Sequence, residues 1–421
     1  MTIDTIYQHF LKCNTVSTDT RKITKGCMFF ALKGGNFNGN TFAKNAIENG
    51  ALFAVIDDEE FQFSNQYILV DDVLKALQDL ATLHRKTLNI PIISLTGSNG
   101  KTTTKELINS VLSKKYHTTA TVGNLNNHIG VPLTLLSMTS TTEIGIVEMG
   151  ANHQKEIEFL TNIALPDYGL ITNFGKAHLE GFGGIQGVIK GKSELYDHLK
   201  KHHKTIFVNI NDTLQVKQVG DYEKVVLFGS DTKLQESQPY VNLKFKDHIV
   251  KTHLTGAYNY NNVSVAIAIG QYFKVSDEYI VAAIEHYIPN NNRSQIIEKN
   301  GHHIILDAYN ANPSSMTAAL NNFNQLDGVN KVAILGDMFE LGKDAKIEHQ
   351  TIADYTNQLG LKHVILVGKN FYAIDSKADN TSYFKSFEAL KNTFEMFQFK
   401  SNMFLIKGSR GMALERILDL L

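Results

Sequence analysis

The sequence predicts an α/β protein built from three domains, and two observations lead to this fold class. Short apolar runs of strand length alternate with helical patterns along most of the 421 residues, which is typical of parallel sheets covered by helices. The same alternation starts afresh twice, near residues 90 and 297. We therefore expect a small α/β domain at 1–89, a central parallel-sheet domain at 90–297 and a C-terminal Rossmann-like α/β domain at 298–421.

In the first domain, three apolar runs predict strands: "CMFFAL", "LFAVID" and "YILV". Gly- and Asn-rich turns such as "KGGNFNGN" separate them, and one helix is expected at Val73 to Lys86. In the central domain the predicted strands are "PIISLTG", "IGIVEMG", "YGLITNFG", "TIFVNI" and "VVLFG". An Asn-rich turn at 290 to 292 precedes the last block, whose strands are "HHIILDAYN", "KVAILGD", "HVILVG" and "MFLIKGS".

The composition excludes several classes of protein. The 41 Lys and Arg residues are balanced by 42 Asp and Glu residues, so no basic field exists to hold nucleic acid or an anionic membrane. The apolar runs are far shorter than the ~20 residues of a membrane helix. With only Cys13 and Cys27, and a start unlike a signal peptide, we expect a cytoplasmic protein, by default a monomer.

The stretch "SLTGSNGKTTTKEL" predicts a phosphate loop between a strand and a helix that starts at about Thr103. Such a loop needs glycines that let N–H groups converge, a helix N-terminus behind them, and a Lys and a Thr for phosphate and Mg²⁺. Those residues are present as Gly97, Gly100, Lys101 and Thr102, although Leu95 stands where the general pattern has a glycine. The alternative is an ordinary strand-to-helix turn with a chance Gly-Lys-Thr.

Two side chains that follow the next strands favour the phosphate loop. Glu148 in "VEMGANH" and His178 in "NFGKAHLEGFG" come where ligands bind in open α/β sheets, beyond the carboxyl ends of the strands. A carboxylate and an imidazole there would reach a Mg²⁺ beside the phosphates. Taken singly, Glu148 is equally well a turn residue and His178 a half-buried histidine.

A series of motifs covers nearly the whole chain in a fixed order. They are "STDTRKITKGCMFFALKG", "TGSNGKTTTKE", "EMGANH", "NFGKAHLEGFGG", "GKSELYDHL", "NRSQ", "DAYNANPSSM", "LGDMFELG" and "KGSRGM". In these motifs the chain resembles the Mur ligases of peptidoglycan synthesis, whose phosphate loop has the short form TG-x-x-GKT/S. "AHLEGFG" and "YNANPSSM" look most like the members that join D-alanyl-D-alanine to UDP-N-acetylmuramoyl-tripeptide.

The resemblance implies an ATP-dependent ligase that works through an acyl phosphate, with two Mg²⁺ ions and UDP-MurNAc-pentapeptide as product. The implied catalytic residues are Lys101, His178, Lys192 and Asp307. The implied ATP-binding residues are Gly97, Ser98, Asn99, Gly100, Lys101, Thr102, Thr103, Asn259, Asn262, Arg293 and Asp307. The implied metal ligands are Thr102, Glu148, His178 and Lys192, the last as a carbamate. The implied substrate-binding residues are Ser17, Thr18, Arg21, Asn126, Asn127, Asn310, Asn312, Ser409 and Arg410.

Some of these roles have simpler alternatives in the residues themselves. Lys192 alone would be taken for a surface lysine, Arg293 for one side of an interdomain salt bridge, and Asp307 for a strand-end cap. Asn-rich loops such as that of Asn126 and Asn127 are commonly plain turns. Tyr258 replaces a histidine of the family's nucleotide segment, where an aromatic ring would lie against adenine.

Other functions account for fewer of these residues than the ligase does. An ATPase or nucleotide switch would need only the loop and Glu148, and would leave His178, Lys192 and "DAYNANP" without a use. A ligase that adds the third amino acid of the peptide, or a folate-type ligase, stays open as an alternative. In the ligase we expect ATP and the UDP-sugar peptide to favour a closed arrangement in which Asp307 and Asn310 meet the phosphate loop.

Overall fold

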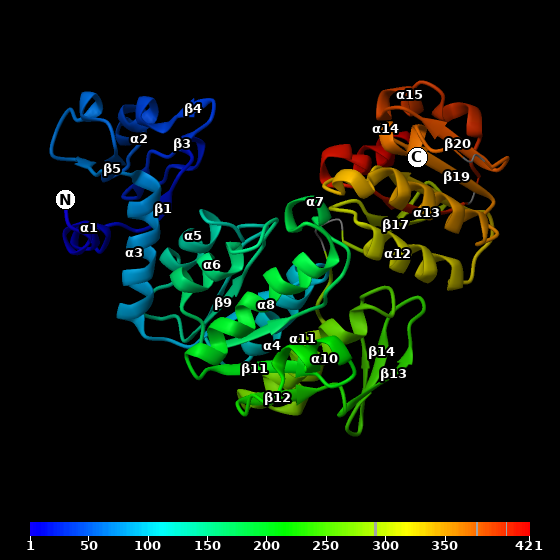
Figure 1. Ribbon diagram of the computed structural model, residues 1–421, viewed down its shortest axis with the longest axis horizontal. Coiled ribbons are helices and arrows are strands. Elements are labelled where there is room, and N and C mark those ends of the chain that lie inside the picture. Colours follow the sequence, from blue (N-terminus) through cyan, green and yellow to red (C-terminus); the bar gives the residue numbers. More distant parts are fainter. Residues whose placement is uncertain (290–292, 376–377, 401) are drawn as a thin grey trace.

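The computed structural model describes residues 1–289, 293–375, 378–400 and 402–421. It consists of three α/β domains that follow one another along the chain (Figure 1), as predicted. The Asn-rich turn predicted at 290 to 292 lies outside the described residues. The boundaries near 90 and 297 stay predictions. Helix α3 ends at Leu88 and strand β16 begins at Gln295.

The N-terminal domain contains a four-stranded parallel sheet of order β1-β2-β5-β6. Its strands are β1 (Val16–Ser17), β2 (Met28–Phe30), β5 (Phe53–Ile56) and β6 (Tyr67–Leu69). The last three coincide with the predicted apolar runs. The other elements are α1 (Ile3–Phe10), the hairpin of β3 (Lys33–Gly34) and β4 (Phe37–Asn38), and α2 (Ala43–Glu48). None of these was predicted.

Helix α3 (Val73–Leu88) fastens the N-terminal domain to the central one. Asp72 caps its start by accepting the N–H of Lys75 at 2.8 Å. On its buried face, the Arg85 guanidinium forms an ion pair of 2.7 Å with Asp167 and donates to the Ala164 carbonyl. The helix therefore joins parts of the chain about 80 residues apart.

We expect Arg85→Ala to lower the free energy of unfolding by about 3 kcal/mol, because it removes one of the two cations paired with Asp167 and the donor of the buried hydrogen bond to the Ala164 carbonyl. Asp167 keeps an ion pair of 2.7 Å with Lys204, which limits the loss. Urea denaturation measures the effect. The control is Lys44→Ala, which removes an exposed pair with Glu48 and should cost less than about 0.5 kcal/mol. A loss below 1 kcal/mol for Arg85→Ala would contradict the prediction.

The central sheet is parallel throughout, in the order β12-β11-β10-β7-β9-β8. Its strands are β7 (Ile92–Thr96), β8 (Thr118–Ala120), β9 (Ile144–Glu148), β10 (Tyr168–Ile171), β11 (Thr205–Asn209) and β12 (Val225–Phe228). After β7 the chain first builds one side of the sheet and then, from β10, the other. The loop after β7 thus lies at a topological switch point, where ligands bind in such sheets.

Helices cover both faces of the central sheet. One face packs on α4 (Lys101–Leu112), α10 (Asn259–Tyr272) and α11 (Asp277–Glu285). The other packs on α3, α5 (Gly130–Leu136), α6 (Glu156–Ala164) and α8 (Ile185–Lys201). The short helices α7 (Leu179–Phe182) and α9 (Thr213–Val219) complete the layer. A small antiparallel sheet that was not predicted follows, with strands β13 (Thr232–Glu236), β14 (Asn242–Phe245) and β15 (His248–Lys251).

A buried histidine near the end of α8 predicts acid sensitivity. Burial, with His202 and Lys201 nearby, lowers the pKa of His198 to about 4, against about 6.5 in an unfolded chain. Between these values the unfolded state binds more protons, so the contribution of His198 to stability is full above pH 6.5 and is lost toward pH 4. In urea titrations between pH 7 and pH 5, His198→Gln should lose less stability than the wild type. A matching decline in both would contradict this, and the exposed His203→Gln is the control.

The C-terminal sheet has the order β16-β17-β21-β18-β19-β20. Its first strand is antiparallel and the other five are parallel. The strands are β16 (Gln295–Lys299), β17 (His302–Asp307), β18 (Lys331–Gly336), β19 (His363–Val367), β20 (Thr381–Phe384) and β21 (Met403–Lys407). The helices are α12 (Pro313–Gln325), α13 (Ala345–Asn357), α14 (Lys369–Tyr372) and α15 (Phe387–Lys391). Four of these strands were predicted, and β16 and β20 were missed.

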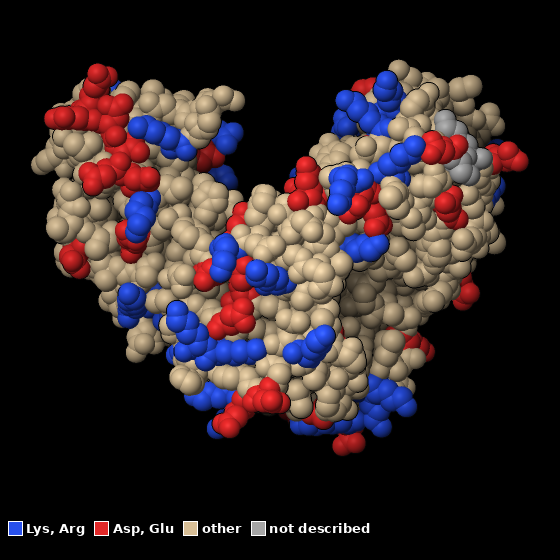
Figure 2. All heavy atoms as spheres, viewed as in Figure 1, with Lys and Arg blue, Asp and Glu red and all other residues tan. Residues whose placement is uncertain are grey.

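The outer surface fits the balanced charge of the sequence. Figure 2 shows Lys and Arg side chains interspersed with Asp and Glu over the visible face, and a notch between the N-terminal and C-terminal lobes. Within the described residues, no helix combines the length and the apolar character that crossing a membrane requires.

Candidate active site

A cavity of about 1450 Å³ lies between the central and C-terminal domains and reaches helix α3. It collects most of the predicted site residues. Those that line it are Ser98, Asn99, Gly100, Lys101, Thr102, Thr103, Asn126, Asn127, Glu148, His178, Asn259, Asn262, Arg293, Asp307, Asn310, Asn312, Ser409 and Arg410. The predicted residues outside its lining are Gly97, Lys192, Ser17, Thr18 and Arg21.

The loop between β7 and α4 has the geometry of a phosphate loop. Leu95 is fully buried within β7, so the position that is a glycine in the general pattern belongs to the strand here. Gly97 has φ 144°, and a Cβ there would come 2.0 Å from the Thr172 hydroxyl. Gly100 has φ 79°, and helix α4 begins at Lys101, two residues before the predicted start. The first N–H groups of α4 have no acceptor inside the helix and are available to an anion.

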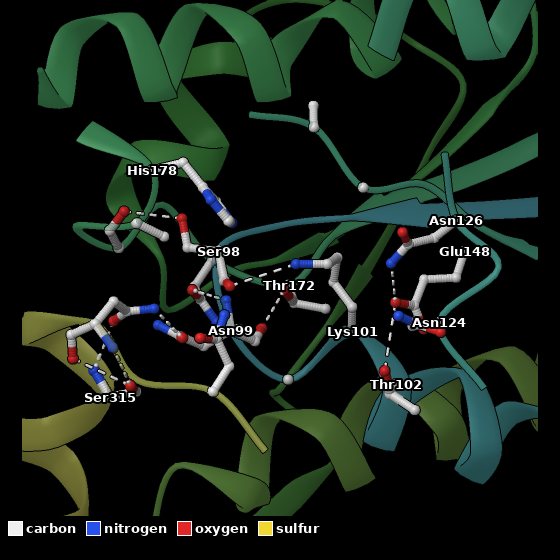
Figure 3. Close-up of a pocket in the computed structure, with 18 of the residues that line it drawn as sticks. Ser98, Asn99, Lys101, Thr102, Asn124, Asn126, Glu148, Thr172, His178 and Ser315 are labelled. Atoms are coloured by element: carbon white, nitrogen blue, oxygen red, sulfur yellow. Dashed lines mark hydrogen bonds between the residues drawn. The ribbon is translucent and has the colours of Figure 1, made fainter. Parts of the chain in front are cut away.

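Lys101 folds back over this loop. Its Nζ donates to the Gly97 carbonyl at 2.7 Å and lies 3.4 Å from the Ser98 carbonyl oxygen (Figure 3). Burial lowers the pKa of Lys101, and Glu148 partly opposes this shift. The loop itself is tied to the segment after β10, because Ser98 donates to Gly175 O and Asn173 donates to Asn99 O. A phosphate group placed on the loop would therefore meet a cation that is already in place.

Glu148 ends strand β9 and has one carboxylate oxygen to spare. The Thr102 hydroxyl, at 3.3 Å, and the Asn126 amide, at 2.8 Å, both donate to Oε1, and in Figure 3 they approach Glu148 from opposite sides. Oε2 is buried without a hydrogen-bond partner. A buried carboxylate oxygen without a partner calls for an explanation, and beside a threonine hydroxyl it suits a hard cation such as Mg²⁺.

The protein residues alone do not surround a metal. Among the described residues, no three His, Cys, Asp or Glu side chains are grouped as a metal site. Mg²⁺ is commonly held by one or two carboxylates together with phosphate oxygens and water. Thr102 and Glu148 fit that kind of site beside the phosphate loop.

His178 stands at the start of α7 with φ 52°. Its Nδ1 makes a short contact with the carboxylate of Glu340, which follows β18 in the C-terminal domain. The hydrogen bond to His178 lowers the pKa of Glu340. Figure 3 shows the imidazole extending toward the side on which Ser98 and Lys101 lie.

Lys192 is fully buried in α8, so the alternative of a surface lysine is wrong. Its Nζ donates to the Ala151 carbonyl at 3.1 Å and lies 4.9 Å above the Phe182 ring. Burial, followed by the charge of Lys101, lowers the pKa of Lys192 well below its ordinary range. The neutral amine is the form that reacts with CO2.

The predicted nucleotide residues of α10 hold that helix to the first turn of α4, directly after the phosphate loop. Asn262 accepts a hydrogen bond from the Thr104 hydroxyl at 3.1 Å and donates to Asn259 at 2.8 Å. Both asparagines are buried. Tyr258 lines the cavity and bonds through its hydroxyl to Ser294 at 2.6 Å.

Arg293, just before β16, and Asp307, at the end of β17, both line the cavity. The Arg293 guanidinium stacks 3.8 Å above the Tyr309 ring, and its Nε is buried without a partner. Asp307 pairs with Lys407 at 2.5 Å and accepts the N–H of Ser294 at 3.1 Å. The strand-end role expected for Asp307 as an alternative is thus present, whereas Arg293 has no salt bridge among those of the described residues.

The remaining C-terminal residues are partly engaged within the protein. Asn312 caps α12 and donates to Asn99 of the phosphate loop at 2.7 Å. The Ser409 hydroxyl accepts the N–H of Phe339. Asn310 and Arg410 are exposed, although the Arg410 guanidinium lies 3.3 Å from Glu415.

On the opposite side, Asn127 lies in the turn before α5, where its side chain accepts the N–H groups of Ile129 at 3.1 Å and Gly130 at 2.9 Å, as a plain turn residue would. Ser17, Thr18 and Arg21 lie in the N-terminal domain, where Arg21 pairs with Asp19 at 2.8 Å. The structure does not bring these three residues together with the phosphate loop.

Known proteins share this arrangement. Family models match residues 12–85 (Mur ligase family, catalytic domain), 95–270 (Mur ligase middle domain) and 292–410 (Mur ligase, glutamate ligase domain). The UDP-N-acetylmuramoyl-tripeptide–D-alanyl-D-alanine ligase of Bacillus subtilis is 34% identical, with 96% of this chain and 92% of the relative covered. The chain belongs to the Mur ligase family.

Further known proteins are similar to this Mur ligase over nearly their whole length. The ligase of the same name from Escherichia coli is 32% identical over 96% of this chain and 92% of its own length. The crystal structure of MurF from Acinetobacter baumannii has a TM-score of 0.87 at 31% identity and covers 100% of this chain and 98% of that one. MurF from Thermotoga maritima, solved in complex with ADP, has a TM-score of 0.84 at 26% identity, with 98% and 97% covered.

The residues that line the cavity of this Mur ligase and were not predicted include Tyr309, Glu340 and Lys407. Each stands in a motif that was recognised, namely "DAYNANP", "LGDMFELG" and "KGSRG". The motifs were signals for these residues. Their roles were missed because their contacts are with residues distant in the sequence.

Proposed function

We propose that this Mur ligase uses ATP to join D-alanyl-D-alanine to UDP-N-acetylmuramoyl-tripeptide, giving UDP-MurNAc-pentapeptide, ADP and phosphate. The names of the relatives from B. subtilis and E. coli support this activity, because each aligns with nearly the full chain. The structural observation that carries the proposal is the cavity, in which the phosphate loop, Glu148 and the C-terminal residues face one space. We also propose that the three domains join near residues 90 and 297.

The chemistry requires a carboxylate to approach a triphosphate. The terminal carboxylate of the tripeptide attacks the γ-phosphorus, the bond to the β-phosphate oxygen breaks, and ADP leaves. Lys101 and the N–H groups at the start of α4 offset the repulsion and hold the transferring group. The amine of D-alanyl-D-alanine then attacks the acyl carbon, loses a proton and displaces phosphate. The relative solved with ADP supports a nucleotide on this loop.

Two Mg²⁺ ions fit the donors on this chain. Thr102 and Glu148 would hold the first, through the hydroxyl and the unpaired Oε2. His178 and Lys192, as a carbamate, would serve the second. The neutral Lys192 amine attacks CO2 and releases a proton, and the product is a carboxylate-like anion. Bound Mg²⁺ supplies positive charge to the phosphate oxygens.

The other predicted residues divide between the two substrates. Asn259, Asn262, Arg293 and Asp307 are assigned to ATP, with Tyr258 beside the base. Asn310, Asn312, Ser409 and Arg410 are assigned to the dipeptide, because a guanidinium pairs well with its carboxylate. The tripeptide would pass Asn126 and Asn127, and the UDP group would bind Ser17, Thr18 and Arg21. For that, Arg21 would exchange its pair with Asp19.

Phosphate release from ATP tests the proposal. The protein receives UDP-MurNAc-tripeptide with D-alanyl-D-alanine, with D-alanine, or with neither, and separately the dipeptide precursor with a diamino acid. Release that requires both tripeptide and D-alanyl-D-alanine, with pentapeptide found by mass spectrometry, is the expected result. Release with the diamino acid would assign the step that adds the third residue. Hydrolysis that ignores every acceptor would indicate an ATPase.

Both substrates are also expected to compact the protein. The C-terminal domain already contacts the phosphate loop through Asn312 and Asn99, whereas Ser17 and Arg21 lie apart from the cavity. We expect closure to bring Asp307 and Asn310 to the phosphate loop, as the sequence predicts, and also to bring the N-terminal lobe inward across the notch of Figure 2. Small-angle scattering should give a smaller radius of gyration with ATP analogue and UDP-MurNAc-tripeptide together than with either alone. An unchanged radius would count against closure.

A further inference from the structure

Two segments from different domains meet at His178. One is the start of α7, and the other follows β18 and leads through a turn at Gly342–Asp344 into α13. The Glu340 carboxylate contacts His178 Nδ1, and the Glu340 carbonyl accepts the N–H of Glu180 at 3.2 Å. Glu340 is thus held by both its side chain and its backbone.

Both partners of this contact have a backbone conformation that side chains disfavour. His178 has φ 52° and Glu340 has φ 60°, in the left-handed region that costs roughly 1 kcal/mol for a residue with a Cβ. Such conformations persist where the surroundings impose them, and they are frequent at functional sites. Here the strained backbone coincides with the point at which the two side chains meet.

The contact occupies one ring nitrogen and leaves the other available. Among the hydrogen bonds of the described residues, none involves His178 Nε2, and both His178 and Glu340 line the cavity. A histidine that binds a metal commonly gives its second N–H to a carboxylate, which fixes the tautomer and the direction of the ring. In this protein, Glu340 provides the carboxylate that contacts His178 Nδ1.

We propose that Glu340 is a positioning residue for His178, holding Nδ1 so that Nε2 faces the metal beside the phosphates. This rests on the proposed function, in which His178 is a ligand of the second Mg²⁺. Because Glu340 comes from the C-terminal domain, the second metal position is complete only when that domain is docked on α7. Docking and metal binding are then coupled.

Glu340 could instead only hold the two domains together, but other contacts already do this. Lys176 pairs with Glu348 at 2.6 Å, and the Lys176 N–H donates to the Ser314 hydroxyl at 2.9 Å. The pair of Lys176 and Glu348 crosses the same interface but does not touch His178. It supplies a matched control for an effect of docking alone.

The test measures Mn²⁺, a paramagnetic substitute for Mg²⁺ at oxygen-rich sites, by electron paramagnetic resonance on the full chain with ADP. The variants are His178→Ala, Glu340→Ala, Glu340→Gln, the double variant of His178→Ala with Glu340→Ala, and Glu348→Gln as control. We expect Glu340→Ala to weaken the binding of the second Mn²⁺ ion by about 10- to 100-fold. Glu340→Gln retains an acceptor for Nδ1–H and should lose less. Glu348→Gln removes only one of several docking contacts, and the Lys176–Ser314 and Asn312–Asn99 hydrogen bonds remain, so its Mn²⁺ affinity should stay within twofold of the wild type.

The double variant separates positioning from general damage. If Glu340 acts through His178, adding Glu340→Ala to His178→Ala changes the Mn²⁺ affinity no further. The proposal is overturned by unchanged affinity in Glu340→Ala or in His178→Ala, by an equal loss in Glu348→Gln, or by additive losses. If Glu340→Ala does not fold, Glu340→Gln in the same cycle decides. No peptide substrate is present, so a failed ligase assay and a failed Mn²⁺ result remain distinct.

Discussion

Replacing Lys101 by alanine is expected to lower the rate of acyl-phosphate formation by two to three orders of magnitude, about the cost of removing one donor to a developing charge. Lys101 Nζ already lies on the carbonyls of Gly97 and Ser98, so it meets the phosphates without reorganisation. Binding of the UDP-linked substrate should stay within about twofold. The residues assigned to UDP lie in the N-terminal domain and do not line the cavity.

Single-turnover phosphate release measures the first quantity, and calorimetry with UDP-MurNAc-tripeptide measures the second. The control is Lys114→Ala, an exposed lysine just after the same helix. Equal losses of catalysis and substrate binding in Lys101→Ala would overturn the assignment of the two sites to different domains.

Replacing Lys192 by methionine is expected to lower ligase activity by about a hundred-fold, the scale on which losing support for a metal reduces activity, without destabilising the fold. Lys192 is fully buried, and an apolar side chain of similar size removes a costly buried amine. In the wild type, removing CO2 from the buffer should reduce activity and bicarbonate should restore it. In Lys192→Met, neither the removal of CO2 nor the addition of bicarbonate should alter the remaining activity.

Nuclear magnetic resonance with ¹³C-labelled bicarbonate gives an independent readout. A carbamate signal should appear in the wild type and in Lys190→Ala, which removes an exposed lysine two residues earlier on the same helix. It should be absent from Lys192→Met. Activity independent of CO2, together with no ¹³C signal in the wild type, would show that Lys192 works as a plain amine.

Helices and strands whose formation depends on residues close together in the sequence were predicted correctly. The strands β2, β5, β7, β9, β10, β17, β18 and β19 each contain a short apolar run, and α3 has a helical period and a capping aspartate. The elements that were missed are mostly short or polar. Strand β8 is Thr-Thr-Ala, and the strands of the small antiparallel sheet carry exposed Lys, Gln and Glu. Hydrogen bonds to neighbouring strands stabilise these strands, although their own sequence patterns only weakly indicate a strand.

For the site, the loop with the geometry of a phosphate loop was predicted from a local pattern, because Gly97, Gly100, Lys101 and Thr102 stand within one short segment of the chain. Three features could be seen only in the folded protein: Lys192 is buried, Glu148 keeps one oxygen unpaired, and Glu340 meets His178 from another domain. Burial and pairing are set by segments that lie far apart in the sequence. A local pattern specifies which groups a segment carries, whereas the packing of the domains specifies which of those groups lose water and which partners they gain.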